Sequence, residues 1–493
     1  MKAIAFDLGA SSGKMLLGEF DGETLSARTV HRFENRQISL GGDLYWNLLG
    51  IYENLTEGIR RACALGRDVV SVGLDTYSND FAFVGPRGDV VSQMRCYRDP
   101  RAARCAEGIY AKISRRELHM LTGNQNALFN TVMQLAAMAE EGERYLFSEG
   151  NTMLLLPDLL GYLLTGEKRS EYTISSVTQM FDYRTGGWSE EILGRFGIPR
   201  TILPPITPSG AVLGRFTARA AADFGTPAMD VVSVCEHDTA SAVAALPTNR
   251  TDVAFISSGT WSLVGVELDE PVVSDETFRY NFALEGGVDG RYRLLKNVMG
   301  LWLAQECRLD WRRRGEEYGY DDLERLARAG SPFRSLIDPD DGRFYEPGEM
   351  TSKIARYCAD TGQPVPETPG QFIRCIDESL ALKYRWTLVR LERIIGRPLR
   401  AIHILGGGSR DGLLDQYTAD ACGRPVYAGP DEAALTGNLL LQLRAYGEVS
   451  SLAQARELSA RSCRITTYEP RSGTAWDDAY GRFLALLGKT GGA

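Results

Sequence analysis

The sequence predicts an α/β fold built as two domains. Strand-like runs alternate with amphipathic helices along most of the 493-residue chain, which is too long for a single hydrophobic core. A strand, a Gly/Ser-rich turn and a second strand also occur twice, at residues 4–17 and 253–264. Because each half of the chain carries one such hairpin, we expect domains at residues 1–246 and 247–493.

The N-terminal half starts with the first hairpin, and a second turn follows at Asp21-Gly22. Apolar residues at helical spacing predict a helix over residues 44–64. The continuous apolar run at residues 69–74 predicts a buried parallel strand, which ends at Asp75 and opens onto a ligand cleft. Helical periodicity continues at residues 128–138 and 153–164.

The C-terminal half continues the alternation of helices and strands. After a strand at residues 231–234 and a helix at 239–246, the second hairpin begins. The pattern then predicts helices at residues 298–314, 369–395, 411–422 and 432–446, and a strand at residues 401–405.

Composition excludes several classes of protein. The net charge of -9 argues against nucleic-acid binding through a basic surface. We see no secretory signal and no apolar stretch long enough to span a bilayer, so we expect a cytoplasmic protein without a membrane partner. The nine cysteines form no CxxC pair, which favours reduced thiols. Cys358 and Cys375 flank a turn-rich stretch and can lie close together, with or without a bond.

The first Gly/Ser turn has the composition of a phosphate cradle. Backbone N–H groups in a small-residue turn form a concave nest for phosphate oxygens, and Gly13 permits close approach. Asp7 precedes the turn at a strand end, where an acid can hold Mg²⁺, and Lys14 follows it. The alternative is a tight hairpin that needs glycine for its backbone conformation. The turn is not a Walker A loop, because no GxxxxGK[ST] leads into a helix.

Two further turns in the C-terminal half offer similar chemistry. Ser257-Ser258-Gly259-Thr260 repeats the first turn with a hydroxyl added, although Ser and Thr are also ordinary turn residues. Gly406-Gly407-Gly408 lies between a strand and a helix, where the backbone can pass close to a nucleotide.

His237-Asp238 lies where a strand passes into a small-residue helix. Asp238 is either the N-cap of that helix or a general base that takes a proton from a substrate hydroxyl. Asn297 and Gln305 are about two turns apart on one predicted helix, so they either face one cleft or are polar surface residues.

Taken together, these segments resemble the FGGY carbohydrate kinases over nearly the whole chain. The matching segments are Asp7 to Lys14, His31 to Asn35, Leu44-Tyr45-Trp46, Tyr97-Arg98-Asp99, Glu171-Tyr172-Thr173, His237 to Val243, Ser258 to Leu263, Glu285-Gly286-Gly287, Lys296 to Trp302 and Gly406-Gly407-Gly408. So many ordered matches make the resemblance more specific than any single turn.

The resemblance implies a two-domain actin-like (ribonuclease H-like) ATPase fold with the active site in the interdomain cleft. It also implies transfer of phosphate from ATP, with Mg²⁺, to a ketose hydroxyl, and the most similar members act on the 1-hydroxyl of L-rhamnulose. By position, Asp238 would be the general base and Asp7 the metal ligand. The ATP contacts would be Ala10, Ser11, Ser12, Gly13, Lys14, Thr260, Gln305 and Gly407. The sugar contacts would be Ser78, His237, Asp238 and Asn297.

The sequence departs from the family pattern at two places, and the second leaves the sugar open. Lys14 stands where the family usually has Arg, and Tyr77-Ser78-Asn79 replaces an expected Trp-Gly-Val in a stretch that resembles part of the sugar pocket. Such changes can redirect specificity. The alternatives are a kinase for L-fuculose, xylulose or another polyol, or a catalytically silent sugar- or nucleotide-binding protein. The expected partners are a sugar and ATP, and nothing in the sequence supports an oligomer.

Overall fold

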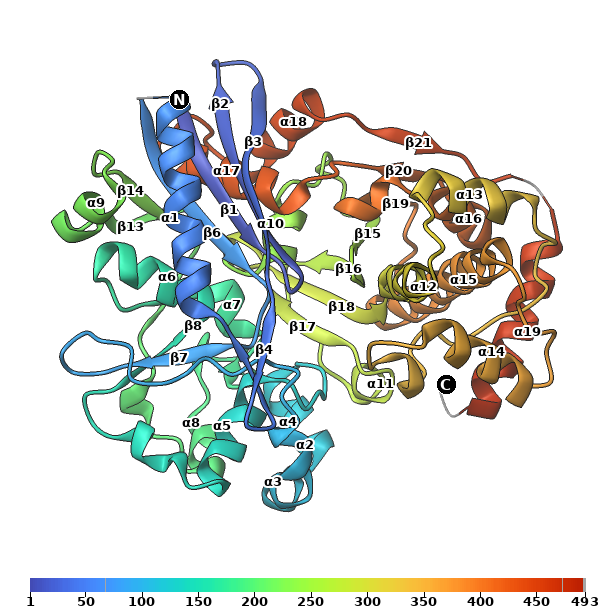
Figure 1. The fold of residues 1–493 in the computed structure, drawn as a ribbon, viewed down its shortest axis with the longest axis horizontal. Helices are drawn as coiled ribbons and strands as arrows, with labels where there is room; N and C mark the ends of the chain where they lie inside the picture. Colours follow the sequence, from blue (N-terminus) through green and yellow to red (C-terminus); the bar gives the residue numbers. More distant parts are fainter. Residues whose placement is uncertain (67, 472, 491–493) are drawn as a thin grey trace. The chain divides into compact units, whose positions relative to one another are not determined.

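The computed structural model describes residues 1–66, 68–471 and 473–490. The chain forms two compact units, and both combine strands with helices (Figure 1). The first unit consists of Met1–Asn249, Glu267–Leu294 and Ala433–Cys463, and the second of Arg250–Val266, Leu295–Glu432 and Arg464–Ala493. The predicted boundary between residues 246 and 247 divides the chain once, and it stays a prediction.

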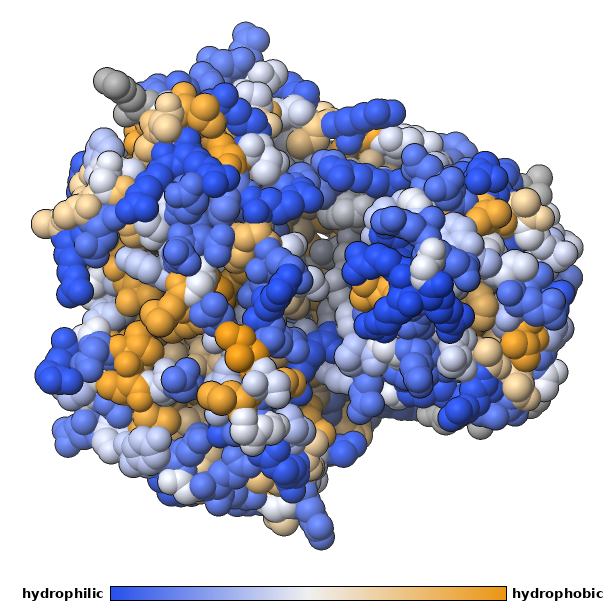
Figure 2. Space-filling model, viewed as in Figure 1, coloured by the Kyte–Doolittle hydropathy of each residue, from blue (hydrophilic) through white to orange (hydrophobic). Residues whose placement is uncertain are grey.

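Hydrophilic residues cover most of the face shown in Figure 2, and hydrophobic residues are scattered among them. The most exposed large apolar side chains include Leu49 and Leu40, on α1 (Leu48–Leu65) and β4 (Gln37–Leu40). None of the helices in the described part of the chain has the length and hydropathy required to span a membrane.

A six-stranded sheet forms the centre of the first unit, in the order β13-β14-β6-β1-β2-β3 (Figure 1). β1 pairs antiparallel with β2 and parallel with β6. The loop at Asp21-Gly22 joins β2 to β3, as predicted. The strands are β1 (Lys2–Leu8), β2 (Ser12–Phe20), β3 (Leu25–Glu34), β6 (Val69–Thr76), β13 (Ala211–Arg215) and β14 (Asp230–Ser233).

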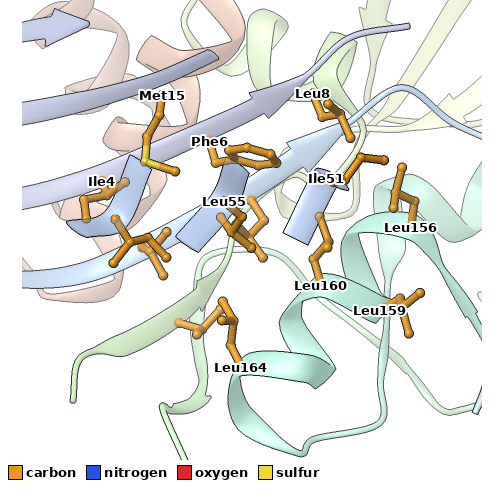
Figure 3. Packing of buried hydrophobic residues seen from close by; sticks show 14 of the residues in the cluster. Ile4, Phe6, Leu8, Met15, Ile51, Leu55, Leu156, Leu159, Leu160 and Leu164 are labelled. Atoms are coloured by element: carbon orange, nitrogen blue, oxygen red, sulfur yellow. The ribbon is translucent and has the colours of Figure 1, made fainter. Parts of the chain in front are cut away.

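Alternation along β1 sends apolar side chains to both faces of this sheet. Ile4, Phe6 and Leu8 pack with α1 and α6 (Leu156–Thr165) in a fully buried cluster, and Figure 3 shows these side chains pointing toward one another. On the other face, Ala3 and Ala5 pack against leucines of α17 (Ala433–Ala445). Helices on both faces explain why β1 and β6 read as continuous apolar runs.

A second apolar cluster of this unit is mainly helical and lies in the stretch predicted to be rich in helices. It contains side chains of α3 (Ala106–Lys112), α4 (Arg115–Thr122), α5 (Thr131–Glu140), α8 (Glu190–Phe196), β7 (Phe81–Val84) and β8 (Thr152–Leu155). The unit also contains β5 (Asp43–Trp46), α2 (Arg101–Arg104), β9 (Ser170–Glu171), α7 (Tyr172–Ser176), β10 (Phe181–Asp182), β11 (Gly187–Trp188), β12 (Ile206–Thr207), α9 (Ala218–Phe224), α10 (Asp238–Ala244), α11 (Asp275–Arg279), β17 (Ala283–Gly286) and α18 (Leu452–Ser462).

The second sheet has seven strands in the order β17-β18-β16-β15-β19-β20-β21. Its strands beyond β17 are β15 (Val253–Ser258), β16 (Trp261–Leu268), β18 (Tyr292–Met299), β19 (Ala401–Leu405), β20 (Val426–Ala428) and β21 (Thr466–Tyr468). The helices of the second unit are α12 (Trp302–Arg313), α13 (Tyr320–Ala329), α14 (Met350–Asp360), α15 (Pro369–Ile395), α16 (Gly412–Cys422) and α19 (Ala475–Thr490).

The two Gly/Ser hairpins occupy equivalent places in their sheets. β1 lies between its antiparallel partner β2 and the parallel strand β6. In the same way, β15 lies between its antiparallel partner β16 and the parallel strand β19. The repeat seen in the sequence is therefore a structural repeat, and the α/β class is confirmed.

Four predicted helices start too early. One is the helix predicted at residues 128–138, where α5 starts only at Thr131, and in the other three a strand precedes the helix. The predicted helix at residues 44–64 begins with strand β5, and α1 starts only at Leu48. The predicted helix at 153–164 begins with residues of β8. The predicted helix at 298–314 includes the last two residues of β18, and α12 starts at Trp302.

All nine cysteines are free. Cys358 on α14 and Cys375 on α15 are both buried, and their interaction lowers the pKa of the Cys358 thiol and raises that of the Cys375 thiol. The two side chains are therefore neighbours, as the flanking positions around the turn predicted.

Candidate active site

The first Gly/Ser turn is closed and braced by hydrogen bonds of the first unit. The Gly9 N–H donates to the Ser12 carbonyl oxygen at 2.9 Å. The Asn35 side-chain amide donates to the Gly9 carbonyl at 3.0 Å, and its backbone N–H donates to the Ser11 carbonyl at 3.0 Å. A Cβ at Gly13 would lie 2.2 Å from the Phe33 ring, so no larger residue fits this position. Ser11 and Ser12 are exposed, and Ala10 and Lys14 are half-buried.

Two carboxyl groups lie side by side at the ends of β1 and β6. Asp7 is opposite Lys14 in the β1–β2 pair and opposite Asp75 in the β1–β6 pair. Asp75 is fully buried, and its Oδ2 accepts a hydrogen bond from the Asn438 amide at 2.6 Å, whereas Oδ1 has no hydrogen-bond partner. Burial, reinforced by the negative charge of Asp7, raises the pKa of Asp75 well above its usual value.

Asp238 presents one carboxylate oxygen for chemistry. It is the first residue of α10, and His237 is the N-cap, so the predicted N-cap role of Asp238 is wrong by one position. Asp238 Oδ1 accepts hydrogen bonds from the Thr239 N–H at 2.5 Å and the Thr239 hydroxyl at 3.1 Å, and it lies 3.4 Å from His237 Nε2. No described residue donates a hydrogen bond to Oδ2. This arrangement suits a general base, because one oxygen is fixed while the other can accept a proton.

The backbone just before Asp238 is held by two neighbouring elements. The Thr76 N–H at the end of β6 donates to the Glu236 carbonyl at 2.9 Å. The buried Glu171 carboxylate accepts hydrogen bonds from the Glu236 N–H at 3.2 Å and from the Thr173 hydroxyl at 2.5 Å. The Thr173 oxygen in turn accepts from the His237 N–H at 3.3 Å. The turn that carries Asp238 is therefore fixed on both sides.

Ser78 lies beside a group of aromatic side chains in the first unit. The ring of Tyr77 lies 5.0 Å from that of Trp46 and 6.0 Å from that of Tyr97. Asn79 has a positive φ of 79°, and its amide donates to the Ser78 hydroxyl at 3.0 Å. The unusual Tyr77-Ser78-Asn79 stretch thus combines a buried aromatic face with polar groups.

In the second unit, the turn at Gly259-Thr260 is closed and joined to the start of α12. The Gly259 N–H donates to the Trp261 carbonyl at 2.8 Å. The Gly300 N–H donates to the Thr260 carbonyl at 3.1 Å, and the Leu301 N–H donates to the Gly259 carbonyl at 3.0 Å. The carbonyl oxygen of Leu301 accepts a hydrogen bond from the Gln305 N–H. The turn at Thr260 and the start of the helix that carries Gln305 are therefore connected by hydrogen bonds.

The glycine loop after β19 packs directly on the second turn. A Cβ at Gly408 would lie 2.0 Å from the Ser258 hydroxyl oxygen, and Gly406 has a φ of +81°. At Gly407, by contrast, no atom lies within 4 Å of the position that a Cβ would take. The lack of a side chain at Gly408 therefore allows the loop to pack against Ser258, whereas Gly407 borders open space.

Asn297 does not share a helix with Gln305, so that prediction is wrong. Asn297 lies near the end of β18, and Gln305 lies on α12. A sharp turn at Gly300 separates the two elements, and a Cβ there would lie 2.6 Å from the Ser262 hydroxyl oxygen.

Three polar residues of the site were missed from the sequence. Asp75 was noted only as the end of a strand that opens onto a ligand cleft, and Glu171 only as part of a segment that matches the family. Asn438 carried no signal, since its contact with Asp75 spans 363 positions along the chain. Among the described residues, no group of three or more His, Cys, Asp or Glu side chains is arranged to hold a metal ion.

Comparison with protein families supplies the decisive observation. The FGGY family of carbohydrate kinases matches the chain twice, with its N-terminal domain over residues 2–245 and its C-terminal domain over residues 254–446. This chain belongs to the FGGY family of carbohydrate kinases. It is therefore a sugar kinase, a phosphotransferase that uses ATP.

Curated relatives and solved structures agree with this membership. The chain is 41% identical to the rhamnulokinase of Bacteroides thetaiotaomicron over 479 residues, which cover 97% of this chain and 98% of that protein. It is 35% identical to the rhamnulokinase of Bacillus subtilis over 467 residues, which cover 95% of each. The structure of xylulose kinase from Rhodospirillum rubrum aligns with a TM-score of 0.79 at 20% identity and covers 99% of both chains. The predicted two-domain α/β fold of an FGGY kinase is thus confirmed.

Proposed function

We propose that this FGGY kinase transfers the γ-phosphate of ATP to the 1-hydroxyl of L-rhamnulose. The observation that carries the proposal is the full-length similarity to proteins named rhamnulokinase, at 41% identity in one case. The free Oδ2 of Asp238 supports the chemistry, because an alcohol needs a proton acceptor as it attacks phosphorus.

In this proposal Asp238 is the general base. The sugar hydroxyl oxygen forms a bond to the γ-phosphorus, the bond to the oxygen that bridges the β- and γ-phosphates breaks, and ADP leaves. The hydroxyl proton passes to Asp238 Oδ2. Ser78, His237 and Asn297 are proposed to contact the sugar and to orient the attacking hydroxyl, a contribution that lowers the entropic part of the barrier.

The nucleotide is proposed to bind at the two Gly/Ser turns and at the glycine loop. In the first unit, Ala10, Ser11, Ser12, Gly13 and Lys14 would contact the phosphates. In the second unit, Thr260, Gln305 and Gly407 would contact ATP. The exposed residues Ser11 and Ser12 in the first turn and the open space beside Gly407 support these assignments.

The residues at the end of β1 fit a magnesium ion that arrives with ATP. Mg²⁺ is usually held by one or two carboxylates together with substrate phosphates, and Asp7 next to the unpartnered Oδ1 of Asp75 offers such oxygen ligands. Asp7 is proposed as the ligand. When bound, the ion would neutralise charge on the transferring phosphate.

Two wider assignments also belong to the proposal. The sugar-binding domain is placed at residues 1–246 and the ATP-binding domain at residues 247–493, close to the family matches at 2–245 and 254–446. The protein is proposed to act in the cytoplasm, with the sugar and ATP as its partners.

A kinase for L-fuculose, xylulose or another polyol is the second candidate. It is favoured by Tyr77-Ser78-Asn79, which replaces the expected Trp-Gly-Val, and by the Tyr77 hydroxyl, which is buried without a hydrogen-bond partner. A polar group of this kind can select one pattern of hydroxyls over another.

A substrate panel distinguishes the candidates. The purified chain is assayed for ADP release with MgATP and L-rhamnulose, L-fuculose, D-xylulose or glycerol, and the product is identified by NMR. We expect kcat/KM for L-rhamnulose to exceed the others by about 10²-fold or more, with phosphate on the 1-hydroxyl. Preference for another sugar would replace the substrate assignment, and sugar binding without ADP release would identify a silent binding protein.

A further inference from the structure

His237 is enclosed by two charged side chains that the sequence analysis did not assign. Glu285 lies on β17 and Arg293 on β18, and both belong to the first unit together with His237. The side chains of His237, Glu285 and Arg293 are 6%, 4% and 0% exposed. They therefore form a buried triad directly behind Asp238.

The distances within this triad are all those of direct contacts. Arg293 Nη2 lies 3.1 Å from Glu285 Oε2 and 3.2 Å from His237 Nδ1. Glu285 Oε2 lies 3.4 Å from His237 Nδ1. A further hydrogen bond, from Arg293 Nε to the Gly286 carbonyl at 2.8 Å, fixes the plane of the guanidinium. A Cβ at Gly286 would lie 2.7 Å from the Tyr172 ring, so the strand that carries Glu285 is closely packed at this point.

Hydrogen-bonding capacity assigns the proton on His237. A guanidinium can only donate, so His237 Nδ1 accepts from Arg293, and in the neutral ring the proton is then on Nε2. Nε2 is the nitrogen that faces Asp238 Oδ1 at 3.4 Å. In this tautomer His237 directs an N–H at the oxygen that Thr239 already holds, and Oδ2 is left for the substrate.

The charge of Arg293 keeps Glu285 ionised despite its burial. Burial raises the pKa of Glu285, but the positive charge of the Arg293 guanidinium opposes it, and the pKa lies below its usual value. An ionised, buried carboxylate holds its arginine in one orientation, since separating the pair would leave two uncompensated charges. The donor that reaches His237 Nδ1 is thus fixed in place.

We propose that the Glu285–Arg293 pair positions the catalytic base by fixing the Nε2–H tautomer of His237, whose N–H in turn orients Asp238. Neither side chain of the pair touches the reacting atoms. The inference rests on the proposed role of Asp238 as the base, and it adds a positioning role to the proposed sugar contact of His237. The general rule is that the second ring nitrogen of a histidine sets which nitrogen carries the proton.

The first test reads the tautomer directly. The chain contains four histidines, so ¹⁵N labelling of histidine gives a small set of signals, and His237→Gln identifies the one of interest. In the wild-type protein we expect a neutral ring with the proton on Nε2. In Glu285→Gln and Arg293→Lys we expect a mixture of tautomers, whereas Glu270→Gln, which alters an exposed glutamate, leaves the signal unchanged. An unchanged signal in both triad variants would overturn the proposal.

The second test separates positioning from simple destabilisation. We expect Glu285→Gln to lower kcat by about 10- to 100-fold while the KM for ATP stays unchanged, because a misplaced base slows the chemical step. In an Asp238→Asn background, Glu285→Gln should have little further effect on kcat, since its influence passes through Asp238. Equal losses in both backgrounds, or a loss of thermal stability without a loss of kcat, would refute positioning.

The same variants also distinguish a wrong assignment of Asp238 as the base from a wrong assignment of the Glu285–Arg293 pair. If Asp238→Asn alone keeps near-normal turnover, the proposed function loses its base, whatever Glu285→Gln does. If Asp238→Asn loses turnover and Glu285→Gln does not, the base stands and only the positioning role falls.

Discussion

At the scale of single residues, the glycine loop after β19 shows why residue type alone does not reveal function. Gly407 and Gly408 are neighbours with the same chemistry, yet a Cβ at Gly408 would collide with Ser258, and a Cβ at Gly407 would meet no atom within 4 Å. The local pattern predicted a glycine turn between strand and helix, and only the family resemblance singled out Gly407. Which glycine has open space beside it depends on Ser258, which lies about 150 positions earlier in the chain.

This difference makes a paired prediction. Gly408→Ala should lower the free energy of unfolding by about 1–3 kcal/mol, since the added methyl overlaps Ser258. Gly407→Ala should leave the unfolding temperature of the free protein unchanged but weaken ATP binding by about 10-fold, because the methyl enters space assigned to the nucleotide. Thermal unfolding with and without ATP, together with calorimetric titration, measures both effects.

Two outcomes would contradict the assignment at this position. Wild-type ATP affinity in Gly407→Ala would remove Gly407 from the nucleotide site. A destabilised Gly407→Ala would show that the loop packs more tightly than the structure indicates.

At the scale of elements, the sequence predicted α15 and β19 to the residue. α15 begins at Pro369, a residue suited to the first turn of a helix, and ends before Gly396, which has a φ of +69°. Three of the four wrong helix starts lie where a strand precedes the helix, as at β8 and α6. An apolar strand end continues the apolar pattern of the next helical turn, and periodicity alone does not separate the two.

One contact between elements holds the helix that carries Asp238. Gly437 on α17 faces α10 so closely that a Cβ would lie 1.8 Å from the Ser241 carbonyl oxygen. The contact is between backbones, so neither side can yield by changing a rotamer. Local patterns predicted both helices, whereas their packing depends on residues about 200 positions apart.

We therefore predict that Gly437→Ala damages both stability and activity. Separating α10 from α17 should lower the free energy of unfolding by about 1–3 kcal/mol or more, and the shift of Asp238 should reduce kcat. Gly481→Ala on α19 is the matched control: no atom lies within 4 Å of its Cβ position, so it should raise stability by about 0.5–1 kcal/mol. Urea unfolding and steady-state kinetics test the pair, and equal behaviour of the two variants would disprove the close contact.

At the scale of the whole molecule, each compact unit is built from segments that are not consecutive in the chain. Ala433–Cys463 belongs to the first unit although it follows most of the second. Leucines of α17 pack on Ala3 and Ala5 of β1, and Asn438 of the same helix holds Asp75. The sequence indicated two domains and the family through ordered motifs, but this return of the chain depends on long-range packing that no local pattern encodes.

A cluster of buried carboxyl groups in the first unit gives the molecule a specific pH dependence. Asp158, Glu171 and Glu236 line one small cavity and are all buried. Burial raises the pKa of Asp158 to about 7 and that of Glu171 to about 7. For Glu236, burial together with the charges of Asp158 and Glu171 raises the pKa well above its usual value.

The sign of the effect follows from proton linkage. Between the ordinary pKa of about 4 and the raised values near 7, the folded protein holds protons that the unfolded chain releases. The free energy of unfolding therefore falls as the pH rises from about 4 to about 7. Glu236→Gln removes one of these groups and its repulsion of Asp158, so the variant should lose less stability over the same interval.

Denaturant unfolding from pH 4 to pH 8 measures this slope, and we expect the wild type to lose more stability over this interval than Glu236→Gln. Glu167→Gln is the control, because Glu167 lines the same cavity but is exposed, and its slope should match the wild type. Identical slopes in all three proteins would mean that the cluster is ionised in the folded state. Since the Glu236 N–H binds Glu171 two residues before Asp238, kcat measured across the same pH range would then show whether these carboxyl groups influence the base at all.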